Sequence, residues 1–168
     1  MSNSADKQLN IREGKEQDIP LILDFIIQLA TYEKLAHEVK ATPEQLHKTL
    51  FGEQAFAKVL IAEWDGKAAG FALYFFNYST FLAKPGLYLE DLFVSPQVRG
   101  KKIGKALLSK LAQIALANDC GRFEWWVLDW NQPAINFYRS IGAEGMSDWT
   151  VQRVDGEALI ELADANRE

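Results

Sequence analysis

Residues 87–106 read LYLEDLFVSPQVRGKKIGKA, and this stretch decides the fold class. The apolar run over 87–94 predicts a strand, and a basic loop with two glycines, Gly100 and Gly104, follows a short turn. The next residues, 104–118, carry apolar side chains at helical spacing and predict an amphipathic helix. A strand, a glycine-containing loop and a helix in this order are typical of an α/β protein.

The rest of the chain supplies the other elements of a mixed α/β domain. Apolar runs bounded by turn residues predict strands, and apolar residues three to four positions apart predict helices. No repeat, low-complexity tract or linker-like segment interrupts the pattern, so we expect a single domain over residues 1–168. The predicted strands are 9–13, 58–63, 69–78 and 123–128, with a last hairpin of 149–154 and 158–162, and the predicted helices are 17–29, 43–51 and 133–141.

Length and composition exclude several classes of protein. The chain has 168 residues, of which 48% are hydrophobic and 24% charged, and its net charge is −5. This is the size of one typical domain, and the composition excludes a disordered chain or a fibre. The apolar runs are too short for a membrane helix, and the polar start over 1–10 lacks the apolar segment of a secretory signal.

The cysteine count and the charge give further expectations. A single cysteine, Cys120, and two histidines are too few for a structural zinc site, so we expect no metal. Scarce cysteine fits a reducing, cytoplasmic compartment. An acidic chain does not favour nucleic-acid binding, and it suits a small cationic ligand.

The stretch 92–118 departs from this acidic balance, because it holds five basic residues and no acid. Most of them lie in the loop over 97–106, which leads into the predicted helix. A helix N-terminus presents free backbone N–H groups and the positive end of its dipole, and glycines allow a ligand to approach closely. Together these features suit a phosphate or pyrophosphate. Spacing alone leaves a solvated basic helix start as the alternative, and the Walker A and G-x-G-x-x-G patterns are both absent.

The segment 87–106 resembles the GNAT superfamily of acetyl-CoA-dependent N-acetyltransferases, and so does 131–138, which reads NQPAINFY. In the family's Arg/Gln-x-x-Gly-x-Gly/Ala motif, this chain has Arg99 and Gly104 but carries Lys102 at the first glycine. The backbone N–H survives that change, so the motif still offers a backbone donor at this position.

The match is closer to the spermidine/spermine N-acetyltransferase branch of the family. That branch has a Tyr-Leu-Glu-Asp strand, as at 88–91, an early Tyr-Glu pair, as at 32–33, and a Phe-Gly-Glu segment, as at 51–53. The resemblance covers roughly residues 11–162.

The resemblance implies a central mixed, mostly antiparallel sheet that splays open at the cofactor site and is flanked by helices. Free backbone groups there would bind the pantetheine arm of acetyl-CoA as an added strand would. The basic loop would hold the pyrophosphate, and members of this branch are usually homodimers. The cofactor-binding residues so implied are Leu92, Phe93, Val94, Arg99, Gly100, Lys101, Lys102, Ile103, Gly104, Lys105, Asn131, Pro133, Ala134 and Tyr138.

Acetyl transfer to an alkylamine needs two proton transfers, because the ammonium must lose a proton and the leaving thiolate benefits from one. The resemblance implies that Glu90 is the base and Tyr138 the acid. The alternative for Glu90 is a carboxylate at the rim of the site that only attracts the cation. The alternative for Tyr138 is an aromatic ring that packs in the core. Asp91 is expected to face the other side of the strand. Cys120, with no histidine nearby in sequence, is expected to be a structural thiol rather than an acetyl carrier.

A cationic acceptor calls for carboxylates and aromatic faces. The expected function is acetyl transfer from acetyl-CoA to a primary amine of a small cationic acceptor, such as a diamine, a polyamine or a lysine analogue like thialysine. The alternatives are acetylation of a protein amino group and a CoA-binding sensor without turnover. The candidate substrate-binding residues are Tyr32, Glu33, Glu90, Glu124, Trp125, Trp126 and Asp148.

Overall fold

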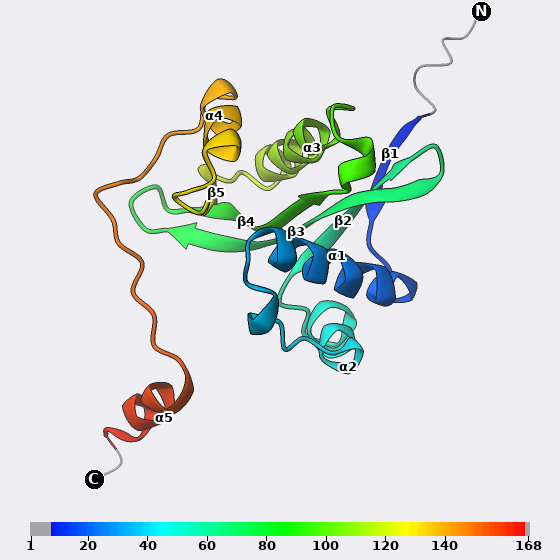
Figure 1. The fold of residues 1–168 in the computed structure, drawn as a ribbon. Coiled ribbons are helices and arrows are strands. Elements are labelled where there is room, and N and C mark those ends of the chain that lie inside the picture. The colour runs from blue at the N-terminus through cyan, green and yellow to red at the C-terminus, as the bar shows by residue number, and fades with distance from the viewer. Residues whose placement is uncertain (1–7, 167–168) are drawn as a thin grey trace, which may run out of the picture. The chain divides into compact units, whose positions relative to one another are not determined.

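A computed structural model describes residues 8–166 of the chain (Figure 1). These residues form two compact units that divide after Leu128, and each unit is described by itself. The expectation drawn from the polar start over 1–10 lies mostly outside the described residues. None of the described helices is long and apolar enough to cross a membrane.

The first unit is built on a five-stranded mixed sheet in which the strands follow one another in sequence order. All neighbouring pairs are antiparallel except β4–β5, which is parallel. The predicted mixed and mostly antiparallel sheet is therefore confirmed, although β5 ends earlier than the predicted strand. The strands are β1 (Leu9–Glu13), β2 (Lys58–Trp64), β3 (Lys67–Ser79), β4 (Lys84–Val94) and β5 (Arg122–Trp125).

Helices cover both faces of this sheet, with α1 and α2 on one side and α3 on the other (Figure 1). Helix α1 (Ile19–Tyr32) inserts Phe25 between the strands' aromatic side chains, since its ring centroid lies 5.5 Å from those of both Phe71 and Phe93. Helix α2 (Pro43–Leu46) continues as a π-helical turn to Phe51. These contacts bury one half of the core.

Helix α3 (Ile103–Ala117) buries the other half of the core. Its buried side chains lie on one face, at Ile103, Leu107, Leu108, Leu111 and Ala115, which is the predicted amphipathic pattern. The strand β4 is followed by a short 3-10 turn over Pro96–Val98, by the loop of residues 99–102 and then by α3. The structure thus confirms the strand, loop and helix predicted from 87–106.

The second unit confirms one predicted helix and corrects one predicted hairpin. Helix α4 (Gln132–Ser140) begins at its cap Asn131 and ends before Gly142, as predicted. The hairpin of 149–154 and 158–162 is wrong: no strand follows β5 in the described residues, and α5 (Gly156–Asp164) is helical. The sequence EALIELA over 157–163 consists mostly of strong helix formers, which explains the difference.

Candidate active site

Strand β4 extends beyond β5, so the sheet opens at this edge. The two strands pair from Gly86 to Leu89 only, and β4 then continues alone on this side to Val94. Within the described chain, residues 90–94 have no strand partner on that side. An extended amide-containing chain can bond to such an edge as an added strand does. The predicted splaying near 92–94 is therefore present.

A β-bulge interrupts β4 where it opens. Leu89 lies opposite Tyr74 and Asp91 lies opposite Leu73, which leaves Glu90 without a partner on β3. Leu73 and Tyr74 are consecutive on β3 and therefore face opposite sides of the sheet. Their partners Asp91 and Leu89 then also face opposite sides, although they are two positions apart on β4. The expectation that Asp91 faces away from Glu90 rests on unbroken alternation, and the bulge removes that alternation.

Three carboxyl groups gather around this bulge. Burial, together with the nearby Glu90 and Glu33 carboxylates, raises the pKa of Asp91 to about 6. Burial also raises the pKa of Glu33, the residue that ends α1. Glu90 itself is exposed. Glu33 at the C-terminal end of α1 and the two acidic residues at the bulge of β4 thus form an acidic site that favours a cation.

The loop between β4 and α3 has the geometry of an anion site. Gly100 has φ +84, and Lys102, the residue before α3, has φ +60. Lys102 therefore keeps the left-handed conformation that glycine adopts readily, at a cost of roughly 1–2 kcal/mol. No side chain caps α3, so the first N–H groups of the helix are open to a ligand.

Gly104 leaves space in front of this helix end. A Cβ atom added there would meet only the Val94 side chain, at 3.7 Å, which is an ordinary contact. The protein itself therefore does not require glycine at this position. Without a side chain at this position, the backbone of the first helical turn is accessible to a ligand.

Two cations of the loop lie over aromatic rings from other elements. The Arg99 guanidinium carbon lies 5.5 Å from the centre of the Tyr32 ring, at the end of α1. The Lys101 ammonium lies 5.5 Å from the Trp64 ring, at the end of β2. Sequence reasoning missed Trp64, because no local pattern signals a contact between segments so far apart in the chain.

The other acceptor candidates of the first unit lie on β5 or directly after it. Glu124 forms an ion pair with Arg122 at 2.7 Å, which already compensates its charge. The Trp125 ring lies 4.9 Å from Phe123. Trp126 is 59% exposed and meets the Tyr88 ring edge-on at 5.9 Å, so it is the more accessible of the two tryptophans.

Two further predicted residues take structural positions. The Phe93 side chain is buried in the core beside Phe25, so any cofactor contact from Phe93 comes from its backbone. Burial raises the pKa of the Cys120 thiol, and Asp119 raises it further. A disfavoured thiolate agrees with a structural thiol rather than an acetyl carrier.

The remaining candidates belong to the second unit. The Asn131 side chain accepts a hydrogen bond from the Ala134 N–H at 3.4 Å and thereby caps α4, with Pro133 in the first turn. Tyr138 lies further along α4, with its ring 5.7 Å from that of Phe137. Asp148 lies in a turn outside the helices. Contact of these residues with the basic loop remains a prediction.

An opened sheet edge beside an uncapped, basic helix N-terminus is the site implied for a CoA-dependent acyltransferase. A comparison with family models supports this class: the acetyltransferase (GNAT) family model matches residues 25–143. The chain belongs to the GNAT acetyltransferase family. It is an acetyltransferase, and acetyl-CoA is the co-substrate of this family.

Curated relatives match over nearly the whole chain. The mouse thialysine N-epsilon-acetyltransferase is 40% identical over 164 residues, which cover 91% of this chain and 96% of the mouse protein. An L-ornithine N5-acetyltransferase of Arabidopsis thaliana is 33% identical, over 89% of this chain and 85% of its own. A human spermidine/spermine N(1)-acetyltransferase-like protein is 34% identical, over 97% of this chain and 25% of its own.

Solved structures show the same fold. An integron cassette protein from the mobile metagenome of V. cholerae has a TM-score of 0.78 and 30% identity, and the match covers 93% of this chain and 98% of that one. An aminoglycoside acetyltransferase from an uncultured soil sample has a TM-score of 0.70 at 22% identity, over 90% and 95% of the two chains. At that identity the second match supports the fold alone.

Proposed function

We propose that this protein transfers the acetyl group of acetyl-CoA directly to a primary amine of a small cationic acceptor. One observation carries the proposal: the basic, uncapped N-terminus of α3 and the acidic bulge of β4 lie at the same opened end of one strand. The first suits a pyrophosphate and the second suits an ammonium group. Acetyl donor and acceptor would therefore meet along β4.

Acetyl-CoA would lie along the free edge of β4 and over the start of α3. The pantetheine arm would bond to the backbone of Leu92, Phe93 and Val94, as an added strand would. Backbone N–H groups of the loop and first helical turn would hold the pyrophosphate, and the side chains of Arg99, Lys101 and Lys105 would add positive charge. The residues Gly100, Lys102, Ile103 and Gly104 would contribute backbone groups, and Asn131, Pro133 and Ala134 would contact the cofactor from α4.

The reaction would begin with a neutral amine. Glu90, directly or through water, would take a proton from the acceptor ammonium, and the amine nitrogen would then attack the thioester carbonyl carbon. The C–N bond forms, the C–S bond breaks, and CoA leaves as a thiolate. The Tyr138 hydroxyl would give that thiolate a proton, and the proton that the nitrogen loses as the amide forms would restore the hydroxyl. Products are the acetylated amine and CoA, and no acetyl group rests on the protein.

The acceptor site would be built from the acids around the bulge. Glu33 and Asp91 would hold the cationic end of the acceptor, while Tyr32 and the exposed Trp126 offer aromatic faces. Glu124, Trp125 and Asp148 are the remaining candidates for contact with the acceptor. The relatives named for thialysine, L-ornithine and spermidine/spermine favour a diamine, polyamine or lysine analogue over a protein amino group. The presence of both Glu90 and Tyr138 favours an enzyme over a CoA sensor.

We further propose that both compact units belong to one acetyltransferase domain. The family match spans the division after Leu128, which supports this view. We also propose that the protein is cytoplasmic and that it forms a homodimer. Sedimentation of the purified chain tests the dimer directly. A monomer at all concentrations would contradict the dimer without affecting the chemistry.

Product analysis tests the proposed function. Incubation with acetyl-CoA and thialysine should give a product heavier by one acetyl group, together with one equivalent of free CoA. Glu90→Gln should lower kcat most at low pH, where the acceptor is fully protonated and a base matters most. An unchanged rate and pH profile in this variant would leave Glu90 only the role of a rim carboxylate.

A further inference from the structure

An aromatic cluster lies on the same face of the sheet as an acid of the β4 bulge. Phe75 pairs with Tyr88 across β3 and β4, and Tyr88 pairs with Glu124 across β4 and β5. Residues that pair across strands share a face, so these three side chains point to one side of the sheet. Leu73, two positions before Phe75 on β3, points to that side as well and pairs with Asp91. The Asp91 side chain therefore lies on the aromatic face.

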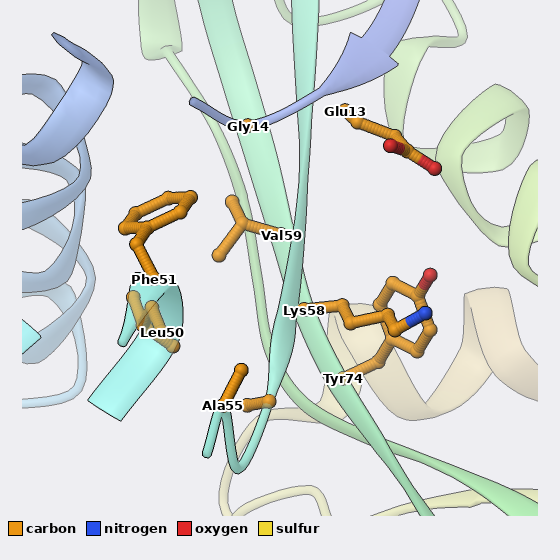
Figure 2. Close-up of a pocket in the computed structure, with 9 residues that line it drawn as sticks. Glu13, Gly14, Leu50, Phe51, Ala55, Lys58, Val59 and Tyr74 are labelled. Atoms are coloured by element: carbon orange, nitrogen blue, oxygen red, sulfur yellow. The ribbon is translucent and has the colours of Figure 1, made fainter. Parts of the chain in front are cut away.

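This face is the one that α1 and α2 cover. Val59 of β2 pairs with Leu73 and so points to the same side. Figure 2 shows the Val59 side chain on the same side of β2 as Leu50, from the turn after α2, and Tyr74 on the opposite side. Helix α1 packs against this face and ends at Glu33. The acids proposed for the acceptor and the aromatic cluster therefore lie on one side of the sheet.

Three rings of this cluster contact one another. The ring centroids of Phe75 and Tyr88 lie 5.0 Å apart, and those of Tyr88 and Trp126 lie 5.9 Å apart with an interplanar angle of 82°. Trp126 directly follows β5 and is exposed, while Phe75 and Tyr88 are half-buried. Two rings that meet at nearly a right angle form a corner, here called the Tyr88–Trp126 corner. The exposure of Trp126 leaves this corner accessible to a small ligand.

The surroundings of the corner are acidic. Burial, together with three nearby carboxylates, raises the pKa of the Tyr88 hydroxyl, and these carboxylates are those of Glu90, Glu124 and Asp91. Arg122 compensates Glu124 through an ion pair at 2.7 Å, but no ion pair within the described part of the chain compensates the two acids of the bulge. Tryptophan and tyrosine rings attract cations to their faces. Rings and carboxylates together therefore favour a cation at the corner and disfavour an anion.

We propose that the Tyr88–Trp126 corner binds a second, non-reacting ammonium group of the acceptor, an inference that rests on the proposed function. Glu90, which faces the reacting amine in that function, lies two residues from Tyr88, about 7 Å along an ideal strand. A pentyl chain joins the two positions. The acceptor class is therefore a dication in which one nitrogen reacts and the other lies against the rings. Alkylation of the second nitrogen is tolerated, because contact with a ring face needs no N–H group.

Two amines of the same shape test the proposal. (5-Aminopentyl)trimethylammonium carries a primary amine and a quaternary ammonium, whereas 6,6-dimethylheptylamine has a carbon atom in place of the quaternary nitrogen. We expect kcat/KM to be about tenfold higher for the cation, since contacts with two ring faces each contribute several-fold. Calorimetry in the presence of CoA, where no acetyl transfer occurs, should give a similar ratio of Kd values. Equal values for the two amines would overturn the proposal.

Ring variants separate the rings from the carboxylates. Trp126→Leu and Tyr88→Leu should each lower the preference for the cation about threefold, whereas Tyr88→Phe keeps a ring and should retain the preference. Phe76→Leu is the control, because Phe76 is partly exposed on β3 and points to the opposite face. Trp126 is exposed, so Trp126→Leu preserves the fold even if Tyr88→Leu does not. An unchanged preference in Trp126→Leu would assign the cation to the carboxylates alone and overturn the proposal.

The inference and the proposed function fail in different ways. Acetylation of both amines at equal rates would overturn the cation site and leave acetyl transfer intact. If no amine is acetylated but calorimetry still shows the preference for the cation and its loss in Trp126→Leu, the proposed function is wrong and the cation site is supported.

Discussion

Asp91 is a carboxyl group held where its charge is disfavoured. Its folded pKa of about 6 lies above the ordinary value of 3.8, so the folded chain keeps a proton that the unfolded chain has already lost. Stability therefore falls as the pH rises from about 4 to about 6, and the loss is at most about 3 kcal/mol. An incoming cation would remove this cost, which links acceptor binding to the ionisation of Asp91.

Replacement of Asp91 by Asn should remove that pH dependence. At about pH 8 the Asp91→Asn variant should be more stable than the parent chain by about 1–3 kcal/mol, and near pH 4 the difference should vanish. Urea unfolding at the two pH values measures it, with Asp129→Asn as an exposed control. A gain of the same size at both values would contradict the raised pKa.

Tyr138→Phe tests the proposed acid. Loss of one hydroxyl should lower kcat about 100-fold, because general acid catalysis contributes roughly that much, while the KM for acetyl-CoA changes little. Steady-state kinetics with a fixed acceptor separate the two. Phe137→Leu, the neighbouring ring on α4, is the matched control for packing. Equal losses in both variants would assign Tyr138 to packing.

At the scale of elements, the start of α3 carries the cofactor site. Gly104→Glu should abolish acetyl-CoA binding, because a carboxylate would then occupy the anion site, while the fold persists since a Cβ meets only Val94 there. Calorimetry with CoA measures the loss of cofactor binding, and circular dichroism shows whether the variant is folded. Lys110→Glu makes a similar change in charge further along α3 and should bind CoA almost normally. Tight binding by the Gly104 variant would refute the assigned site.

The aromatic rings beside the loop should tune the same site. Trp64→Leu and Lys101→Ala should each raise the KM for acetyl-CoA about two- to fivefold, since exposed cation–π contacts contribute roughly 0.5–1 kcal/mol. If the two residues act through one contact, the KM for acetyl-CoA of the double variant should be little higher than that of either single variant. Simple addition of the two effects would show that Trp64 does not act through Lys101.

The sequence predicted those elements whose signals are local. The Asp65-Gly66 turn joins β2 to β3 with positive φ at both residues, as an Asp-Gly hairpin does. Asn131 and Pro133 start α4 for equally local reasons. The bulge at Glu90 depends on how β3 pairs with β4, and a pairing register cannot be read from one strand. Asp155-Gly156 resembled a hairpin turn, but the helix formers after it prevail in α5.

At the scale of the whole molecule, the proposed site has charges of opposite sign on β4 and on the loop and helix that follow it. The chain is acidic overall, yet residues 92–118 hold five basic residues and no acid, while Glu33, Glu90 and Asp91 lie together at the β4 bulge. This division suits a reaction between an anionic donor and a cationic acceptor, because each partner is attracted to its own end of the site. It also predicts that activity falls as salt concentration rises.

Free CoA released from acetyl-CoA over a panel of amines tests the central claim most directly. The panel comprises thialysine, L-ornithine, lysine, putrescine, spermidine and a lysine-containing peptide. We predict rapid release with one or more of the small amines, little release with the peptide, and loss of the signal in Tyr138→Phe. Tight binding of acetyl-CoA with no release for any small amine would contradict the account.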